Sequence, residues 1–256
     1  MFVLLPPSET KRSGGVCMPL AIDSLAFPAL TGRRHMLTAA LAALAADQDA
    51  TVRALKLGRT QLAEIDRNAA LLSSPTTPVI DRYTGVLYDA LAADTLSPAA
   101  RDFAGRHLLV HSALLGPIGG LDLVPAYRLS HDSRLPGLPL KKHWATDVSA
   151  ALEATASDGS GGLLLDLRSE GYVSLGPAAG HPRRFYLRVV TESADGRTRA
   201  LNHFNKKAKG EFTRALLQNG QAFDTVDALL AWAPTAGLAL RPGAAGELEL
   251  VVAGHL

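Results

Sequence analysis

The sequence predicts an α+β fold, in which a single mixed domain has a central sheet with helices around it. Its 256 residues are 47% hydrophobic, which is enough apolar material for one sizeable core and excludes a chain that is disordered throughout. Short apolar runs between turn residues indicate strands, and longer segments with helical spacing indicate helices. These elements do not alternate regularly along the chain, which favours α+β over a regular alternating fold.

Local signals predict each element in turn. Apolar runs predict strands at 2–5, 108–112, 163–167, 238–240 and 247–252. Helical patterns predict helices at 35–46, 60–72, 98–106, 140–154 and 226–233, and 81–93 is expected to be a turn punctuated by glycine that leads into a helix. Ser97 before Pro98 is a typical helix start, because serine caps the helix and proline suits its first position. Asp224 or Thr225 is expected to cap the last helix. If the chain has an internal boundary, it falls in the Ser- and Gly-rich turn at 157–162.

A hairpin is predicted between residues 185–191 and 198–204. The dipeptide Asp195-Gly196 favours a two-residue turn. With that turn, Glu192 faces Arg199, a pair of opposite charges, and Leu187 faces Phe204, an apolar pair. One face of the hairpin is apolar. The other is mainly basic, with an aromatic ring among its charges, and carries Arg184, Tyr186, Arg188, His203 and Asn205.

Positive charge is concentrated in one part of the chain. The net charge is only +2, but residues 181–214 hold nine of the lysines and arginines against three acidic residues. Spread over a hairpin and the helix after it, such a cluster is typical of a surface that binds phosphate groups, or of a solvated basic face.

Cysteine content and hydropathy point to the cytoplasm. The single cysteine, Cys17, excludes an intramolecular disulfide and cysteine-based metal sites, and it fits a reducing compartment. The opening MFVLL is stopped by two prolines and lacks the pattern of an export signal. The apolar stretch 108–127 is interrupted by His111, Pro117 and Asp122, so it does not qualify as a membrane span. We expect a cytoplasmic monomer that binds no membrane.

Metal and acyl-enzyme motifs are incomplete. His107 and His111 stand four residues apart, but Leu108 occupies the position of the zincin glutamate. We therefore expect no metal and no other cofactor. Ser8 and Lys11 match the S-x-x-K pattern, yet its partner motifs are missing. The loop that holds them follows a strand, and it is better explained as a polar loop that binds an anion through Lys11 and backbone N–H groups.

The segment LNHFNKKAKG (201–210) is the strongest candidate for a polyanion site. A strand is expected to present His203 and Asn205, and three lysines then lie where a helix begins. Lysines there oppose the positive end of the helix dipole, and a bound polyanion would offset that cost. A solubilising surface turn is the alternative.

Three stretches of the chain together resemble one protein family. They are LLPPSETK (4–11), DRYTGVLYDAL (81–91) with PAYRLS (125–130), and NHFNKKAKGEFTRALL (202–217). In the same order they resemble the motifs of the bacterial YaaA peroxide-stress proteins. The resemblance implies a single α+β domain with a positively charged cleft, DNA binding, and a role in limiting hydrogen peroxide damage by restraining free iron. Carried over motif by motif, it implies roles for Ser8, Lys11, Tyr83, Tyr127, Arg128, Asn205, Lys206, Lys207 and Lys209.

Two functional hypotheses follow. The first is a binding protein, not an enzyme, whose basic cleft takes duplex or single-stranded DNA without reading its sequence. Tyr186 is then available for stacking, and the phosphate contacts come from Arg184, Arg188, Lys206, Lys207 and Lys209.

The second hypothesis is an enzyme acting on a phosphorylated or nucleobase-containing small molecule, so that a small anionic ligand is the second class of partner. In a deep polar pocket its groups would be Ser8, Lys11, Asp166, Ser169, His203 and Asn205. Direct iron sequestration is disfavoured, because the chain has one cysteine and no legible 2-His-1-carboxylate spacing.

Overall fold

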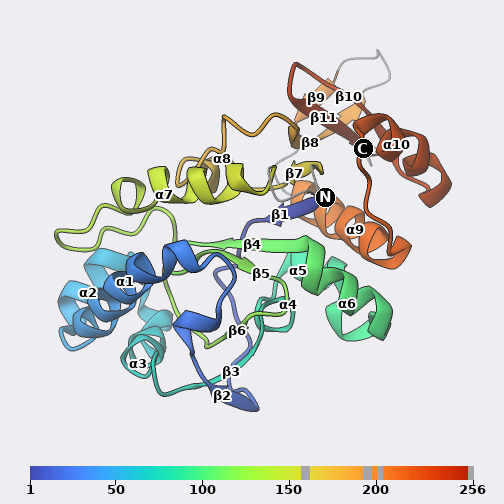
Figure 1. Cartoon of the computed structure of the whole chain (residues 1–256). Coiled ribbons are helices and arrows are strands. Elements are labelled where there is room, and N and C mark those ends of the chain that lie inside the picture. The colour runs from blue at the N-terminus through green and yellow to red at the C-terminus, as the bar shows by residue number, and fades with distance from the viewer. Residues whose placement is uncertain (157–161, 193–197, 201–203, 253–256) are drawn as a thin grey trace.

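The computed structural model describes residues 1–156, 162–192, 198–200 and 204–252. In these ranges the chain forms a mixed sheet with helices around it, which confirms the predicted α+β class. The order of the main sheet is β10-β11-β8-β7-β1-β4-β5, and β9 pairs with β8 off this path. Figure 1 shows β1, at the N-terminus, between β4 and β7 near the centre of the molecule.

Five strands of the main sheet run parallel and form its centre. They are β4 (Leu108–Ser112), β1 (Phe2–Leu5), β7 (Leu164–Asp166), β8 (Arg184–Glu192) and β11 (Glu247–Val252). Three others pair antiparallel at the margins: β5 (Gly116–Gly119), β9 (Thr198–Ala200) and β10 (Ala239–Pro242). The predicted strands at both ends of the chain and at 108–112 and 163–167 are thereby confirmed.

The direction in which strands are added reverses at β1. The chain first places β4 on one side of β1, then returns to place β7 on the other side and continues outward through β8 and β11. This is the 2-1-3-4-5 order of a doubly wound parallel sheet, in which the switch point lies between the first and third strands. Loops leaving the carboxyl ends of β1 and β7 therefore diverge, and open parallel sheets bind their ligands at such a point.

The helices occupy the connections between strands. They are α1 (Thr31–Leu44), α2 (Gln48–Leu55), α3 (Ala63–Ala69), α4 (Val79–Arg82), α5 (Val86–Leu91), α6 (Pro98–His107), α7 (Leu140–Ala154), α8 (Glu170–Val173), α9 (Phe204–Asn219) and α10 (Val226–Trp232). Short 3-10 turns lie at Ile22–Ser24, Pro28–Leu30, Arg59–Gln61, Ala93–Thr95 and Ala233–Ala236. The predicted caps are present: Ser97 Oγ accepts from the Ala100 N–H, and Thr225 Oγ1 accepts from the Ala228 N–H.

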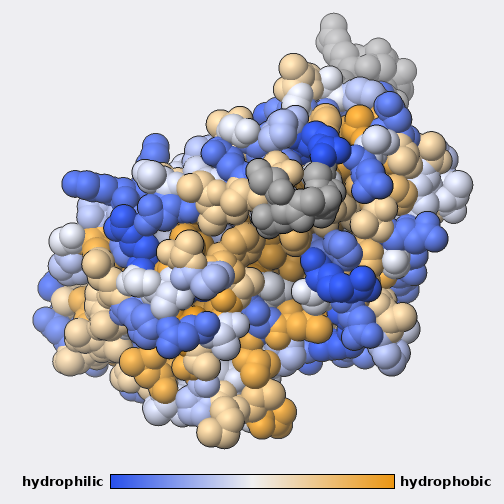
Figure 2. Space-filling view, viewed as in Figure 1, coloured by the Kyte–Doolittle hydropathy of each residue, from blue (hydrophilic) through white to orange (hydrophobic). Residues whose placement is uncertain are grey.

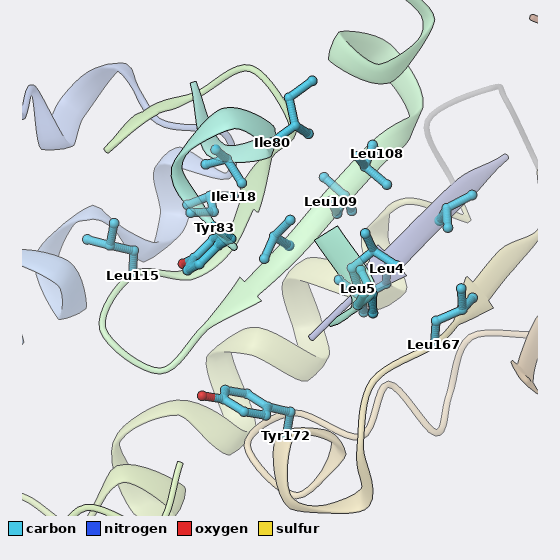
Figure 3. Packing of buried hydrophobic residues seen from close by; sticks show 14 of the residues in the cluster. Leu4, Leu5, Ile80, Tyr83, Leu108, Leu109, Leu115, Ile118, Leu167 and Tyr172 are labelled. Carbon is cyan, nitrogen blue, oxygen red and sulfur yellow. The ribbon is translucent and has the colours of Figure 1, made fainter. Parts of the chain in front are cut away.

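The sheet and the helices enclose one apolar core. Figure 3 shows Leu4 and Leu5 of β1 close to Leu108 and Leu109 of β4 at its centre. Figure 1 shows α7 and α8 to the left of the central strands, and α5, α6 and α9 to the right. A small separate sheet joins β2 (Cys17–Pro19), β3 (Pro75–Pro78) and β6 (Leu123–Val124).

The predicted hairpin exists but is shorter and differs in register. Glu192 pairs with Thr198 and Thr191 with Arg199, so the expected Glu192–Arg199 pairing is wrong by one residue. Leu187 does not face Phe204, because the helix α9 already begins at Phe204. One reason for the shorter hairpin is that β7 occupies residues 184–186 on one side of β8, while β11 runs along the other side; β9 pairs with residues 190–192. The expected turn at 195–196 lies outside the described residues.

Candidate functional site

The loop after β1 is anchored through a buried lysine. Lys11 Nζ donates to the carbonyl oxygens of Ser8 and Glu9, at 3.0 and 3.3 Å, and the Lys11 backbone forms a bridge with Tyr83. The Lys11 ammonium lies 4.3 Å from the ring centre of Tyr127 and 5.2 Å from that of Tyr83. Burial, together with the positive charge of Arg128, lowers the pKa of Lys11 to about 7. At neutral pH this amine therefore exists in both protonation states.

The two tyrosines beside Lys11 form a buried hydrogen-bonded chain. The hydroxyls of Tyr83 and Tyr127 are 2.7 Å apart, and the Tyr127 hydroxyl is 2.6 Å from Ser112 Oγ at the carboxyl end of β4. Burial raises the pKa of Tyr127 to about 12 and also raises that of Tyr83, so both hydroxyls stay protonated. Tyr88 joins the same cluster, since its hydroxyl donates to the Pro6 carbonyl.

Hydrogen bonds to the backbone of Arg128 fix this residue next to the cluster. The Asn68 carboxamide, fully buried on α3, accepts from the Arg128 N–H at 2.8 Å and donates to the Arg128 carbonyl at 2.9 Å. The Arg128 side chain is only 10% exposed, and its Nη2 donates to the Glu9 carboxylate at 2.6 Å. Ser8, Lys11, Tyr83, Tyr127 and Arg128, predicted from separate stretches, therefore come together at the carboxyl ends of β1 and β4.

A second cluster lies at the carboxyl end of β7. Asp166 and Arg168 are both fully buried, and Arg168 Nε and Nη2 donate to the Asp166 carboxylate at 2.8 and 2.6 Å. Arg184 binds the same carboxylate at 2.8 Å. Burial raises the pKa of Asp166, but the charges and hydrogen bonds of Arg168 and Arg184 outweigh that effect and lower the pKa to about 2. The guanidinium groups of Arg168 and Arg184 therefore both bind the single carboxylate of Asp166.

The polar face of β8 continues this cluster outward. Arg184, Tyr186 and Arg188 alternate with the buried Leu187 and Val189, as predicted. The Tyr186 hydroxyl donates to the Arg168 carbonyl at 2.9 Å, and Arg188 forms a two-fold ion pair with Glu247 at 2.6 and 2.7 Å.

Next to this face is a cavity of about 400 Å³. Its charge is mixed rather than uniformly basic, and its lining includes Glu170, His181, Arg184, Tyr186, Arg188 and Glu247.

The basic segment predicted to begin a helix lies inside α9. Asn205 is in the first turn of the helix and not on a strand, and His203 lies outside the described residues. Lys206 and Lys207 are exposed. Lys209 is buried, and its Nζ donates to the Leu167 carbonyl at 2.9 Å. Burial lowers the pKa of Lys209 to about 8, although Asp166 acts in the opposite direction.

The predicted residues thus form two groups at the same edge of the sheet. Lys209 and Tyr186 bind the carbonyls of Leu167 and Arg168, and the Leu167 N–H bonds to Leu4 of β1, so the backbone after β7 connects the groups. Sequence reasoning missed Asn68, Glu9, Ser112 and Arg168. The acidic residue within the apolar run LLLDL was a usable signal for Arg168, because a buried carboxylate needs a nearby cation.

The outer surface carries no large uniform patch on the face drawn in Figure 2. Hydrophilic residues are spread over that face, with hydrophobic residues between them. In the part of the chain that the structure describes, no cluster of three His, Cys, Asp or Glu side chains could hold a metal ion. No helix within the described ranges is long and apolar enough to cross a membrane.

Comparison with known proteins shows the family to which this chain belongs. The family model described as "Peroxide stress protein YaaA" matches residues 1–242, and the chain belongs to this family. The match agrees with the fold and with the position of the three sequence motifs at one edge of the sheet.

Named relatives support the assignment. The UPF0246 protein CE1889 of Corynebacterium efficiens is 39% identical over 98% of this chain and all of its own length. A UPF0246 protein of Corynebacterium glutamicum is 38% identical with the same coverage. The UPF0246 protein SCO2297 of Streptomyces coelicolor is 39% identical over 87% of this chain and 85% of its own.

Proposed function

We propose that this member of the peroxide-stress family is a cytoplasmic, monomeric protein that binds DNA without reading its sequence and thereby limits iron-dependent oxidative damage. The supporting observation is the start of α9. Lys206 and Lys207 project from its first turns into solvent, and the buried Lys209 fixes that end of the helix to the carboxyl edge of the sheet. Exposed cations held on a rigid element are suited to phosphate contacts.

The neighbouring arginines contribute less to this surface than their number suggests. Arg184 and Arg188 each bind a carboxylate, Asp166 and Glu247 respectively. Lys207 is also paired, with Glu211 at 3.5 Å, but both of these side chains are exposed and such a pair is weak. The carboxylates bound by the arginines are more buried, so their charges are compensated more strongly, and the two exposed lysines supply the larger share of attraction for DNA. Their position at the positive end of the α9 dipole destabilises the free helix slightly, and a bound phosphate would relieve that repulsion.

The test is fluorescence anisotropy with labelled duplex and single-stranded DNA between about 50 and 200 mM salt, the range in which several phosphate contacts weaken binding by orders of magnitude. The double substitution Lys206→Ala/Lys207→Ala should lower the salt slope of log K by about 2, the loss of two contacts. Lys141→Ala/Lys142→Ala is the matched control, because these two lysines are also adjacent, exposed and in the first turn of a helix, α7. A flat salt dependence of the native protein, or equal effects of the two double variants, contradicts the proposal.

The convergence of Ser8, Lys11 and Arg128 supports a second candidate, an enzyme for a phosphorylated or nucleobase-containing small molecule. A buried amine whose pKa lies near neutrality is a common feature of catalytic sites. Turnover of a panel of nucleotides, followed by phosphorus and proton NMR, should then be abolished in Lys11→Met and retained in Lys206→Ala/Lys207→Ala. An absence of turnover by the native protein over the whole panel contradicts this candidate.

A further inference from the structure

Arg128 is a buried cation whose charged partner is a surface residue. The main chain of Arg128 is fixed at both polar atoms by Asn68, so the scaffold determines where its guanidinium lies. The partner, Glu9, is 55% exposed. The Glu9 carboxylate is therefore half in water already and loses little by returning to it, whereas the buried arginine would need another anion in its place. The arrangement fixes the arginine and leaves the glutamate free to exchange.

One N–H donor of the Arg128 guanidinium is not used in a hydrogen bond to any described residue. Within the described residues, Arg128 Nε is buried and has no hydrogen-bond partner, while Glu9 accepts only from Nη2. An arginine binds carboxylate or phosphate best through two parallel N–H donors. Glu9 therefore uses half of the donor set that a better-placed anion would fill.

The loop does not need to move for Glu9 to leave. The backbone carbonyls of Ser8 and Glu9 are held by Lys11 Nζ, so the main chain is anchored independently of the Glu9 carboxylate. Rotation of the Glu9 side chain alone would expose Arg128. It would leave the arginine near a second basic side chain, Lys11, on the loop that leaves β1 at the switch point of the sheet.

We propose that Arg128 and Lys11 form a binding site for the dianionic phosphate group of a phosphate monoester, and that the Glu9 carboxylate covers this site in the free protein. Two basic side chains suit a dianion with several acceptor oxygens better than they suit the singly charged phosphodiesters within a DNA strand. The phosphate could belong to a small phosphorylated molecule or to the phosphorylated end of a DNA strand. The site is separate from the exposed lysines of α9.

The first test uses sulfate, whose charge is constant at neutral pH, and then inorganic phosphate. The readout is the Arg128 Nε–H signal in nitrogen-15 NMR, assigned by its loss in Arg128→Lys. Sulfate should shift this signal, and Glu9→Gln should tighten sulfate binding about fivefold by removing the internal competitor. Asp147→Asn is the control, because it removes the same charge from a partly exposed ion pair with Arg33 and should leave the affinity unchanged.

Two results overturn the proposal: an Arg128 signal that sulfate does not move, or a Glu9→Gln protein that binds no tighter than Asp147→Asn. The comparison of these two variants does not depend on the folding of Arg128→Lys, because it uses only substitutions of exposed or partly exposed carboxylates. If Glu9→Gln itself loses its folded NMR spectrum, Glu9 is a structural residue and the proposal is likewise overturned.

Competition experiments identify the source of the phosphate. A nucleoside monophosphate that displaces sulfate, when the corresponding nucleoside does not, indicates a small phosphorylated ligand. A 5′-phosphorylated oligonucleotide that displaces sulfate, when the unphosphorylated one does not, indicates a DNA end. Failure of both phosphorylated probes contradicts the site. Lys206→Ala/Lys207→Ala should leave sulfate binding at Arg128 intact, so this proposal and the proposed DNA surface can fail independently.

Discussion

Arg168 Nη1 lies 2.7 Å from His111 Nδ1, and this contact fixes the tautomer of a fully buried histidine. A guanidinium can only donate, so Nδ1 must accept and the proton of neutral His111 is on Nε2. Within the described part of the chain, Nε2 has no partner. Burial and the charge of Arg168 lower the pKa of His111 well below its ordinary value. The pair thus keeps a neutral imidazole beside a buried ion pair.

Loss of Arg168 should destabilise the protein strongly. Arg168→Met leaves Asp166, fully buried, with Arg184 alone, and removing one member of a buried pair typically costs about 3–5 kcal/mol. Urea unfolding at pH 7 measures the change in the free energy of unfolding. Lys56→Met, which breaks a half-exposed pair with Asp132, should cost less than about 1 kcal/mol. Equal losses for the two variants would contradict the buried network.

The same cluster predicts how stability changes in acid. The pKa of Asp166 in the folded protein is about 2, below its ordinary value of 3.8, so its contribution is fully present above about pH 4 and is lost as the pH falls towards 2. Asp166→Asn should lower stability at pH 7 and flatten its decline between pH 4 and 2. Unfolding by urea across this interval measures both, and an unchanged slope in the variant would argue against a depressed pKa.

Lys11 predicts that stability also rises with pH in the alkaline range. The folded pKa of about 7 is below the ordinary value of 10.5, so between these pH values the unfolded chain holds a proton that the folded chain has released. Stability should therefore rise with pH in this interval, by at most about 1.4 kcal/mol for each pH unit from this group. Lys11→Met should reduce the rise. Lys209→Met should remove a second, smaller part, because its pKa is lowered to about 8.

The helices α9 and α5 pack so closely at Gly210 that an alanine at this position should be unfavourable. A Cβ atom on Gly210 of α9 would lie 2.2 Å from the Leu87 carbonyl oxygen of α5. Gly210→Ala should destabilise the protein by about 1–3 kcal/mol, although alanine favours helices. Gly105→Ala in α6 is the comparison, since its Cβ would meet only the flexible end of Leu121. Thermal unfolding that ranks Gly105→Ala as the more damaging change would contradict this packing.

The Asn68 contact can be tested without any ligand. Asn68→Leu removes the partners of both polar groups of the Arg128 main chain, and each unpaired buried group costs about 1–3 kcal/mol. Urea unfolding should show a large loss of stability. Asn219→Leu, whose exposed carboxamide makes one long contact of 3.5 Å to Gln221, should show almost none. A small effect at Asn68 would mean that Arg128 is positioned by something else.

Local signals predicted the elements well and their contacts poorly. The strands at 2–5 and 108–112 and the helix after Ser97 follow from patterns within a few residues, and the structure has all three. The register of the hairpin was wrong by one residue, and its predicted extent was also wrong, because β7, which is distant in sequence, pairs with residues 184–186 of β8. Pairing in a sheet depends on strands that are distant in sequence, whereas a turn dipeptide predicts only the conformation of the few residues around it.

The sequence predicted which residues belong to the candidate site, but not how they are arranged in space. The resemblance picked out Tyr83, Tyr127 and Arg128, but nothing in the sequence places the two hydroxyls 2.7 Å apart. Asn68 contacts Arg128 across sixty positions of chain, and an asparagine in a helical segment has no local feature that marks such a role. The exposed Lys206 and the buried Lys209 also look alike in sequence, because burial follows from how α9 packs on the edge of the sheet.

The central position of β1 has a consequence for synthesis of the chain. On the ribosome, β1 emerges first, β4 can pair with one side of it only after residue 112, and β7 reaches the other side only after residue 166. During that interval a nascent apolar strand keeps one hydrogen-bonding edge open, and open edges invite pairing with other chains. Truncated products that stop before β7 should therefore aggregate, while folding of the full chain must wait for contacts of high sequence separation.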